Sequence, residues 1–81
     1  MGFNVIIKNQ EKENKVVENC ENGDTVLELK QKYAAMGVDM LVDNMRFVCG
    51  GNECENNQSL ADAGIQEGTP VMVVYQVIGG N

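Results

Sequence analysis

A single helix signature, set among stretches that alternate like strands, limits the possible folds most. In the stretch NGDTVLELKQKYAAMG, Thr25 is placed as a helix N-cap, and Glu28, three residues on, completes a capping box. One apolar stripe with helical spacing follows: Val26, Leu29, Tyr33 and Met36. Gly37 stands where a C-cap glycine is expected. We therefore predict one helix, over residues 26–36.

The remaining apolar residues alternate with polar ones, as in half-buried strands. This pattern predicts strands over five stretches: residues 3–8, 15–20, 45–49, 52–54 and 71–75. In the second stretch, Val16 and Val17 are adjacent, so one of them must point outward and the register stays open. A turn is expected at Gly50–Gly51, between the third strand and the fourth.

A long loop joins the fourth strand to the fifth. Ser59 and Asp62 have the spacing of a single capped turn, and we expect Leu60 and Ile65 to anchor it to the core. Pro70 then opens the last strand, whose apolar pattern is the most continuous. One helix against a mixed sheet is an α+β layer architecture, in which we expect the last strand inside the sheet beside the first.

Composition narrows the classes of function. The chain has 81 residues, enough for one domain, and a formal net charge of −6. Because affinity for nucleic acids and anionic membranes rests on lysine and arginine, we expect neither as a partner. Basic surfaces of other proteins would be attracted instead. The N-terminal residues lack the apolar run of a signal peptide, and no segment is long enough to span a bilayer. We expect the protein to lie in the cytoplasm or nucleus and to be a monomer when free.

The available side chains argue against enzyme chemistry. There is no histidine, the commonest general base and metal ligand, and we expect no catalytic residue, cofactor or metal. Three cysteines, Cys20, Cys49 and Cys54, are an odd number for disulfides, which favours a reducing compartment. We interpret all three as small core residues. A redox role, or a metal pair formed by Cys49 and Cys54, is the alternative.

Four motifs give the chain a resemblance to a known family. They are DTVLELK at the start of the helix, RFVCGG in the third strand, SLADAGIQ in the turn, and the terminal Gly79–Gly80. Over nearly its whole length the chain resembles ubiquitin and the small ubiquitin-related modifiers, most densely from Arg46 to Gly80. The resemblance implies the β-grasp fold, with a domain over residues 1–76 and a flexible tail over residues 77–81.

The resemblance also implies a function for the tail. In such modifiers the carboxylate of the last glycine is adenylated with ATP, passed to a cysteine thiol and then joined to a substrate lysine. Here that glycine would be Gly80, and a protease specific for Gly-Gly ends would first remove Asn81. The implied partners are activating and conjugating enzymes, the processing protease and substrate lysines. On the residue pattern alone, Gly79–Gly80–Asn81 can also be interpreted as a frayed end.

An apolar cluster on the sheet is the second candidate site. Alternation predicts a group on the face away from the helix: Val48, Met72 and Val74, flanked by Arg46 and Gly51. The resemblance implies that this face binds receptors, and that Gln76 stands where an activating enzyme distinguishes related modifiers. Scattered surface hydrophobes are the alternative interpretation, because Gln10 stands near where ubiquitin has an exposed leucine.

The lysines limit where chains of the protein could form. All of them lie in the first half of the sequence: Lys8, Lys12, Lys15, Lys30 and Lys32. By helical spacing, Lys30 and Lys32 fall off the apolar stripe. The resemblance instead implies that Lys30 is largely buried and is the least accessible linkage site.

Two other functions fit a β-grasp chain. One is an adaptor or complex subunit that binds through its sheet face and never uses the tail. The other is a sulfur carrier, which holds a thiocarboxylate on a terminal glycine. Asn81 disfavours the sulfur carrier, because those chains normally end at the glycine.

Overall fold

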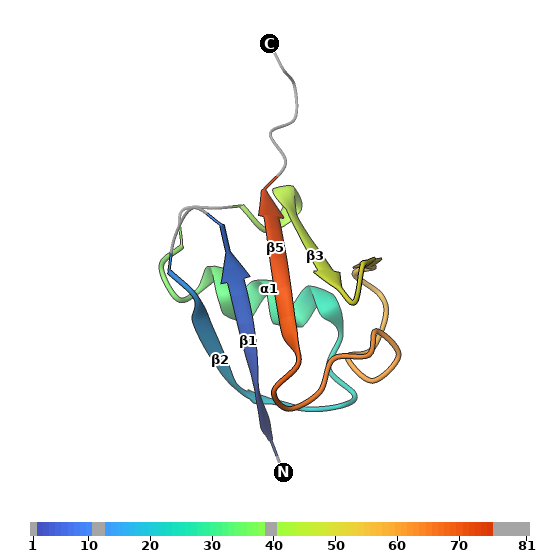
Figure 1. Ribbon diagram of the computed structural model, residues 1–81. Coiled ribbons are helices and arrows are strands. Elements are labelled where there is room, and N and C mark those ends of the chain that lie inside the picture. Colours follow the sequence, from blue (N-terminus) through green and yellow to red (C-terminus); the bar gives the residue numbers. More distant parts are fainter. Residues whose placement is uncertain (1, 11–12, 39–40, 76–81) are drawn as a thin grey trace.

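The computed structural model describes residues 2–10, 13–38 and 41–75. Its elements, drawn in Figure 1, are strands β1 (Phe3–Asn9) and β2 (Lys15–Cys20), helix α1 (Val26–Ala34), a 3₁₀ turn (Val42–Asn44), and strands β3 (Met45–Cys49), β4 (Asn52–Cys54) and β5 (Pro70–Tyr75). All five predicted strands and the helix are therefore present. Within the described residues, no helix is both long and apolar enough to cross a membrane.

The strands form one mixed sheet in the order β2-β1-β5-β3-β4. Strand β5 pairs in parallel with β1 and antiparallel with β3, so the last strand lies inside the sheet beside the first, as predicted. Figure 1 shows α1 lying across one face of this sheet. The arrangement is the α+β, ubiquitin-like β-grasp fold.

The start of the helix is as predicted, and its end is not. Thr25 and Glu28 form the capping box: the Glu28 amide donates to Thr25 Oγ1 at 3.2 Å, and the Thr25 amide donates to Glu28 Oε1 at 2.8 Å. The helix ends at Ala34, two residues early, because the Met36 and Gly37 amides bond three residues back and Gly37 turns the chain at a φ of +89°. This turn carries Met36 off the apolar stripe, where its side chain is 41% exposed.

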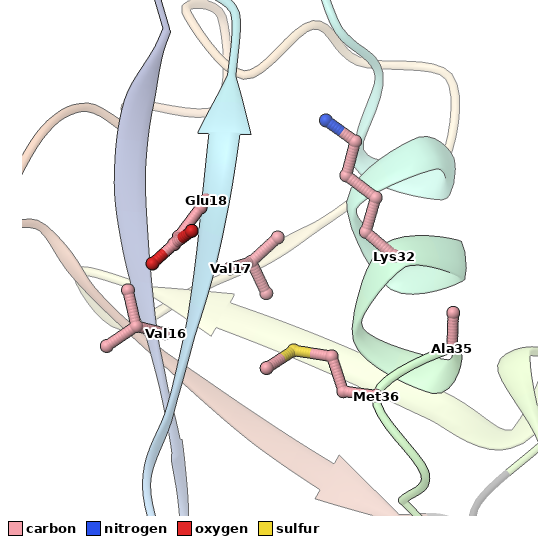
Figure 2. Close-up of a pocket in the computed structure, with 6 residues that line it drawn as sticks. All are labelled: Val16, Val17, Glu18, Lys32, Ala35 and Met36. Carbon is pink, nitrogen blue, oxygen red and sulfur yellow. The ribbon is translucent and has the colours of Figure 1, made fainter.

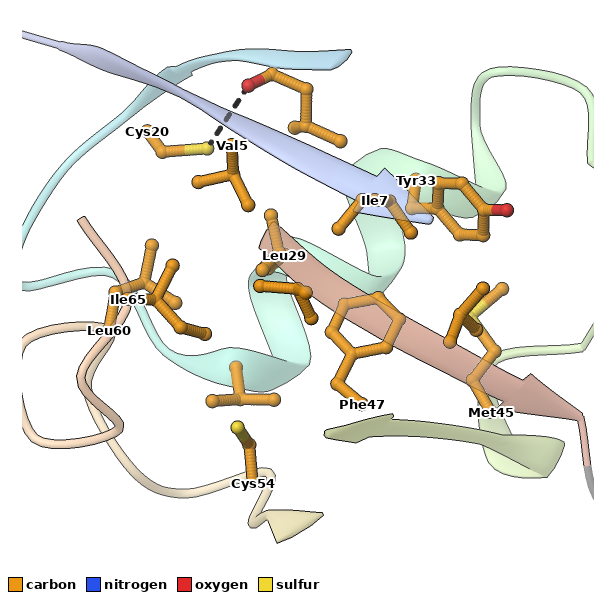
Figure 3. Close-up of a cluster of buried hydrophobic side chains, with 14 residues drawn as sticks. Val5, Ile7, Cys20, Leu29, Tyr33, Met45, Phe47, Cys54, Leu60 and Ile65 are labelled. Atoms are coloured by element: carbon orange, nitrogen blue, oxygen red, sulfur yellow. Dashed lines mark hydrogen bonds between the residues drawn. The ribbon is translucent and has the colours of Figure 1, made fainter. Parts of the chain in front are cut away.

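The core lies between α1 and the inner face of the sheet (Figure 3). Tyr33 from the helix meets Phe47 from β3 edge to face, with ring centroids 6.1 Å apart. Leu60 and Ile65 are fully buried, and the Asp62 amide donates to Ser59 Oγ at 3.1 Å, which confirms the anchored turn. Its backbone is also tied to the helix entrance, since the Leu60 amide donates to the Asp24 carbonyl at 2.7 Å.

A bulge settles the register that the sequence left open in β2. Phe3 pairs with Cys20 but Val5 pairs with Val17, so β2 has one extra residue between the two pairs. Asn19 absorbs it with a φ of +62°. Val17 and Cys20 can thus both face the core, and Val16 is left 44% exposed.

The three cysteines are free thiols. Cys20 and Cys54 belong to the buried core, as predicted, and Cys49 is half-buried against it. Burial raises the pKa of the Cys20 and Cys54 thiols, because a thiolate would lose its hydration there. Within the described residues no group of three or more acidic or cysteine side chains could hold a metal ion.

Candidate functional site

The predicted apolar cluster lies on the solvent-facing side of the sheet. In the β3–β5 register, Val48 is directly opposite Met72, and Arg46 is directly opposite Val74. Opposite residues in an antiparallel pair project to the same face. Their neighbours Phe47, Val71 and Val73 are buried on the helix side, so these four side chains share the other face. We call Val48, Met72 and Val74 the sheet patch.

The sheet patch is accessible to a partner. Met72 is 38% exposed and Val74 is 43% exposed, while Val48 is half-buried between them and β4. Three adjacent apolar side chains at this exposure have no packing role that requires them to be apolar. Gly51 is exposed in the turn that follows β3, where its φ of +86° favours glycine.

Charged side chains border the sheet patch on both sides. Lys8 is the β1 partner of Met72, and Glu53 is the β4 partner of Val48. Arg46 lies 3.5 Å from Glu53 through Nη1 and Oε1, with both side chains about half exposed at 48% and 52%. An ion pair this exposed contributes less than about 1 kcal/mol to stability. Arg46 can therefore turn to an acidic partner at little cost.

Gln10, the residue after β1, contacts the sheet patch through its side-chain amide. Gln10 Nε2 lies 3.9 Å from Met72 Sδ. The resemblance places an exposed leucine near this position, and the chain has instead a hydrogen-bond donor against the methionine sulfur. Sequence reasoning noted the missing leucine but gave no sign of this contact.

An apolar groove lies between the edge strand β2 and the end of α1, away from the sheet patch (Figure 2). Its walls are Val16, Val17 and Glu18 on one side and Lys32, Ala35 and Met36 on the other. Lys32 is held at its rim, where Nζ donates to the Asn19 carbonyl at 2.9 Å. The sequence reading missed this groove because it placed Met36 in the core.

Lys30 is buried, with only 5% of its surface exposed, although helical spacing placed it off the apolar stripe. The reason is nonlocal: its Nζ donates to Asn56 Oδ1 at 2.6 Å and lies 5.8 Å from the centre of the Phe47 ring. Burial lowers the pKa of the Lys30 amine. The burial that the resemblance implied is confirmed.

The tail residues singled out from the sequence, Gln76, Gly79, Gly80 and Asn81, lie outside the described residues. The described chain reaches Tyr75, the last residue of β5, at the edge of the sheet patch. Comparison with known families gives one finding: the family model described as the ubiquitin family matches residues 5–77. The match covers most of the 81 residues and stops before the two glycines.

Proposed function

The chain belongs to the ubiquitin family, and on that premise we propose that it is a protein modifier, joined to substrate lysines through the carboxyl group of Gly80. The observation that supports this most is position: Gly79 and Gly80 lie just beyond the family match, which ends at residue 77, with only Ile78 between them. Because glycine has no side chain, the backbone of an enzyme can approach these two residues closely. The glycines can also adopt backbone conformations that other residues cannot.

The proposed chemistry belongs to partner enzymes. A protease cleaves the bond between Gly80 and Asn81, which frees the Gly80 carboxylate. An activating enzyme joins this carboxylate to the adenylate of ATP and releases pyrophosphate. An enzyme thiol then displaces AMP, and a lysine amine displaces the thiol to leave an amide. We place these steps in the cytoplasm or nucleus.

We propose that receptors bind the sheet patch. Met72 and Val74 are exposed beside the half-buried Val48, and Lys8 and Arg46 border these three side chains in a chain whose net charge is −6. Because the patch does not depend on the tail, it also favours a second function, an adaptor that binds through the sheet and is never conjugated. A sulfur carrier is the third candidate.

Expression of N-terminally tagged forms in the protein's own cells separates these functions. The wild type and a chain ending at Gly80 should both form tagged species heavier by a second protein. Gly80→Ala, and deletion of residues 79–81, should form none. The Val48→Ala/Val74→Ala variant is the matched control: it should keep the covalent adducts and lose noncovalent receptors. If Gly80→Ala leaves partners and phenotype unchanged and no adducts form, the modifier proposal fails and the adaptor replaces it.

A further inference from the structure

Met72 places a sulfur atom at the centre of the sheet patch. It lies between Val48 of β3 and Lys8 of β1, each directly opposite it in its strand pair. The residue is 38% exposed, so small molecules from solvent can reach its side chain. Met45, on the neighbouring strand, is only 2% exposed and faces the core. The two methionines therefore differ sharply in access.

We propose that Met72 is a reversible oxidation site that switches the sheet patch between an apolar and a polar state. Hydrogen peroxide is the oxidant: the Sδ lone pair attacks one oxygen, the O–O bond breaks, and the products are the sulfoxide and water. A reductase that oxidises two thiols to a disulfide removes the oxygen again as water. The inference rests on the proposed role of the sheet patch in receptor binding.

Gln10 is placed to hold the oxidised state. Its Nε2 lies 3.9 Å from Met72 Sδ, where a thioether is only a weak acceptor. A sulfoxide oxygen is a strong acceptor, so the same amide can donate to it and keep the polar group over the patch. An apolar partner would then have to remove this hydrogen-bonded group from water, which should weaken binding by about tenfold or more.

Met36 supplies the matched control. It is 41% exposed, about as open as Met72, but it lies in the groove between β2 and α1 and not on the sheet patch. Peroxide should oxidise both, and only Met72 should change the patch. We therefore compare Met36→Leu with Met36→Leu/Met72→Leu, so that sulfoxides elsewhere in the chain are common to both.

The experiment treats the full chain with hydrogen peroxide and maps sulfoxides by peptide mass, with a phenyl chromatography resin as the apolar probe. Met72 should oxidise at least about tenfold faster than Met45, as expected for an exposed thioether against a buried one. Oxidised Met36→Leu should leave the resin earlier than untreated Met36→Leu. In the Met36→Leu/Met72→Leu variant, oxidation should cause much less of this shift. In NMR spectra the Gln10 side-chain amide should move downfield and return after treatment with dithiothreitol and two methionine sulfoxide reductases, one for each sulfoxide epimer.

Equal oxidation rates at Met72 and Met45, or the same elution shift in both backgrounds, would overturn the inference. These readouts use no receptor, so they fail independently of the proposed function. The receptor role of the patch is instead tested by Val48→Ala/Val74→Ala, in which Met72 is unchanged.

Discussion

The amine of Lys30 donates a hydrogen bond of 2.6 Å to Oδ1 of Asn56, so a residue of an exposed loop holds the charge of a buried lysine. The other close partner is the face of the Phe47 ring, 5.8 Å from the nitrogen to the centroid. A buried charge with few partners is sensitive to the loss of any one of them. The contact thus ties the loop after β4 to the centre of the helix.

Asn56→Ala should destabilise the protein, because it leaves the Lys30 ammonium buried without its acceptor. We expect a loss of about 1–3 kcal/mol in the free energy of unfolding, measured by urea denaturation. Asn57→Ala, at the next exposed position of the same turn, should stay within about 0.5 kcal/mol of the wild type. Equal effects of the two substitutions would contradict the account of Lys30.

The lowered pKa of Lys30 predicts how stability depends on pH. Between that pKa and the ordinary lysine value of about 10.4, the unfolded chain holds a proton that the folded chain has released. Stability from this group therefore rises with pH in this window and falls as pH drops through the folded pKa. The reference is Lys30→Met, because it keeps the buried thiols, which also titrate at high pH. Relative to this variant, the wild type should gain stability as pH rises from neutral toward 10. A difference in urea midpoint between the two proteins that does not change with pH would contradict this prediction.

Exposure predicts which amines can be modified. With a water-soluble acetylating reagent and peptide mapping, Lys30 should react last, because acylation requires its amine to leave the buried site. Lys8 is exposed, and the Lys15 and Lys32 side chains are 28% and 39% exposed. If the protein forms chains, linkage through Lys30 should be the rarest among these. Early acetylation of Lys30 would show that its site opens readily.

The sheet patch should matter for binding and little for folding. Val48→Ala and Val74→Ala should each cost less than about 1 kcal/mol, because both side chains keep contact with water in the folded protein. Val73→Ala, one position away on the buried face, should cost about 1.5–3 kcal/mol. Thermal unfolding of the three variants checks this contrast, and a large loss of stability in Val74→Ala would indicate a structural role for Val74.

Local patterns were enough to predict most of the fold. The capping box at Thr25 and the alternation in each strand are set by residues a few positions apart, and both are confirmed. The errors involve distant partners. Lys30 is buried because of Asn56 and Phe47, which no helical spacing reveals. Met36 leaves the stripe because the helix ends at Ala34 and the Met36 amide bonds three residues back, to the Tyr33 carbonyl.

The candidate site divides in the same way. The sheet patch was predictable, because alternation in two strands assigns Val48, Met72 and Val74 to one face whatever their exact register. The contact between Gln10 and Met72 joins residues 62 positions apart and depends on the pairing of β1 with β5, which places Lys8 opposite Met72. Only the structure shows this contact, and only the structure shows on which face of β2 Val16 lies.

Intact mass spectrometry of the protein isolated from its own cells tests the central claim, modification through Gly80, most directly. The account predicts a free form lighter by one asparagine residue, ending at Gly80. It also predicts species heavier by a whole second protein, in which Gly80 is joined to a lysine amine. Protein that always retains Asn81, with no heavier covalent species, would contradict the claim.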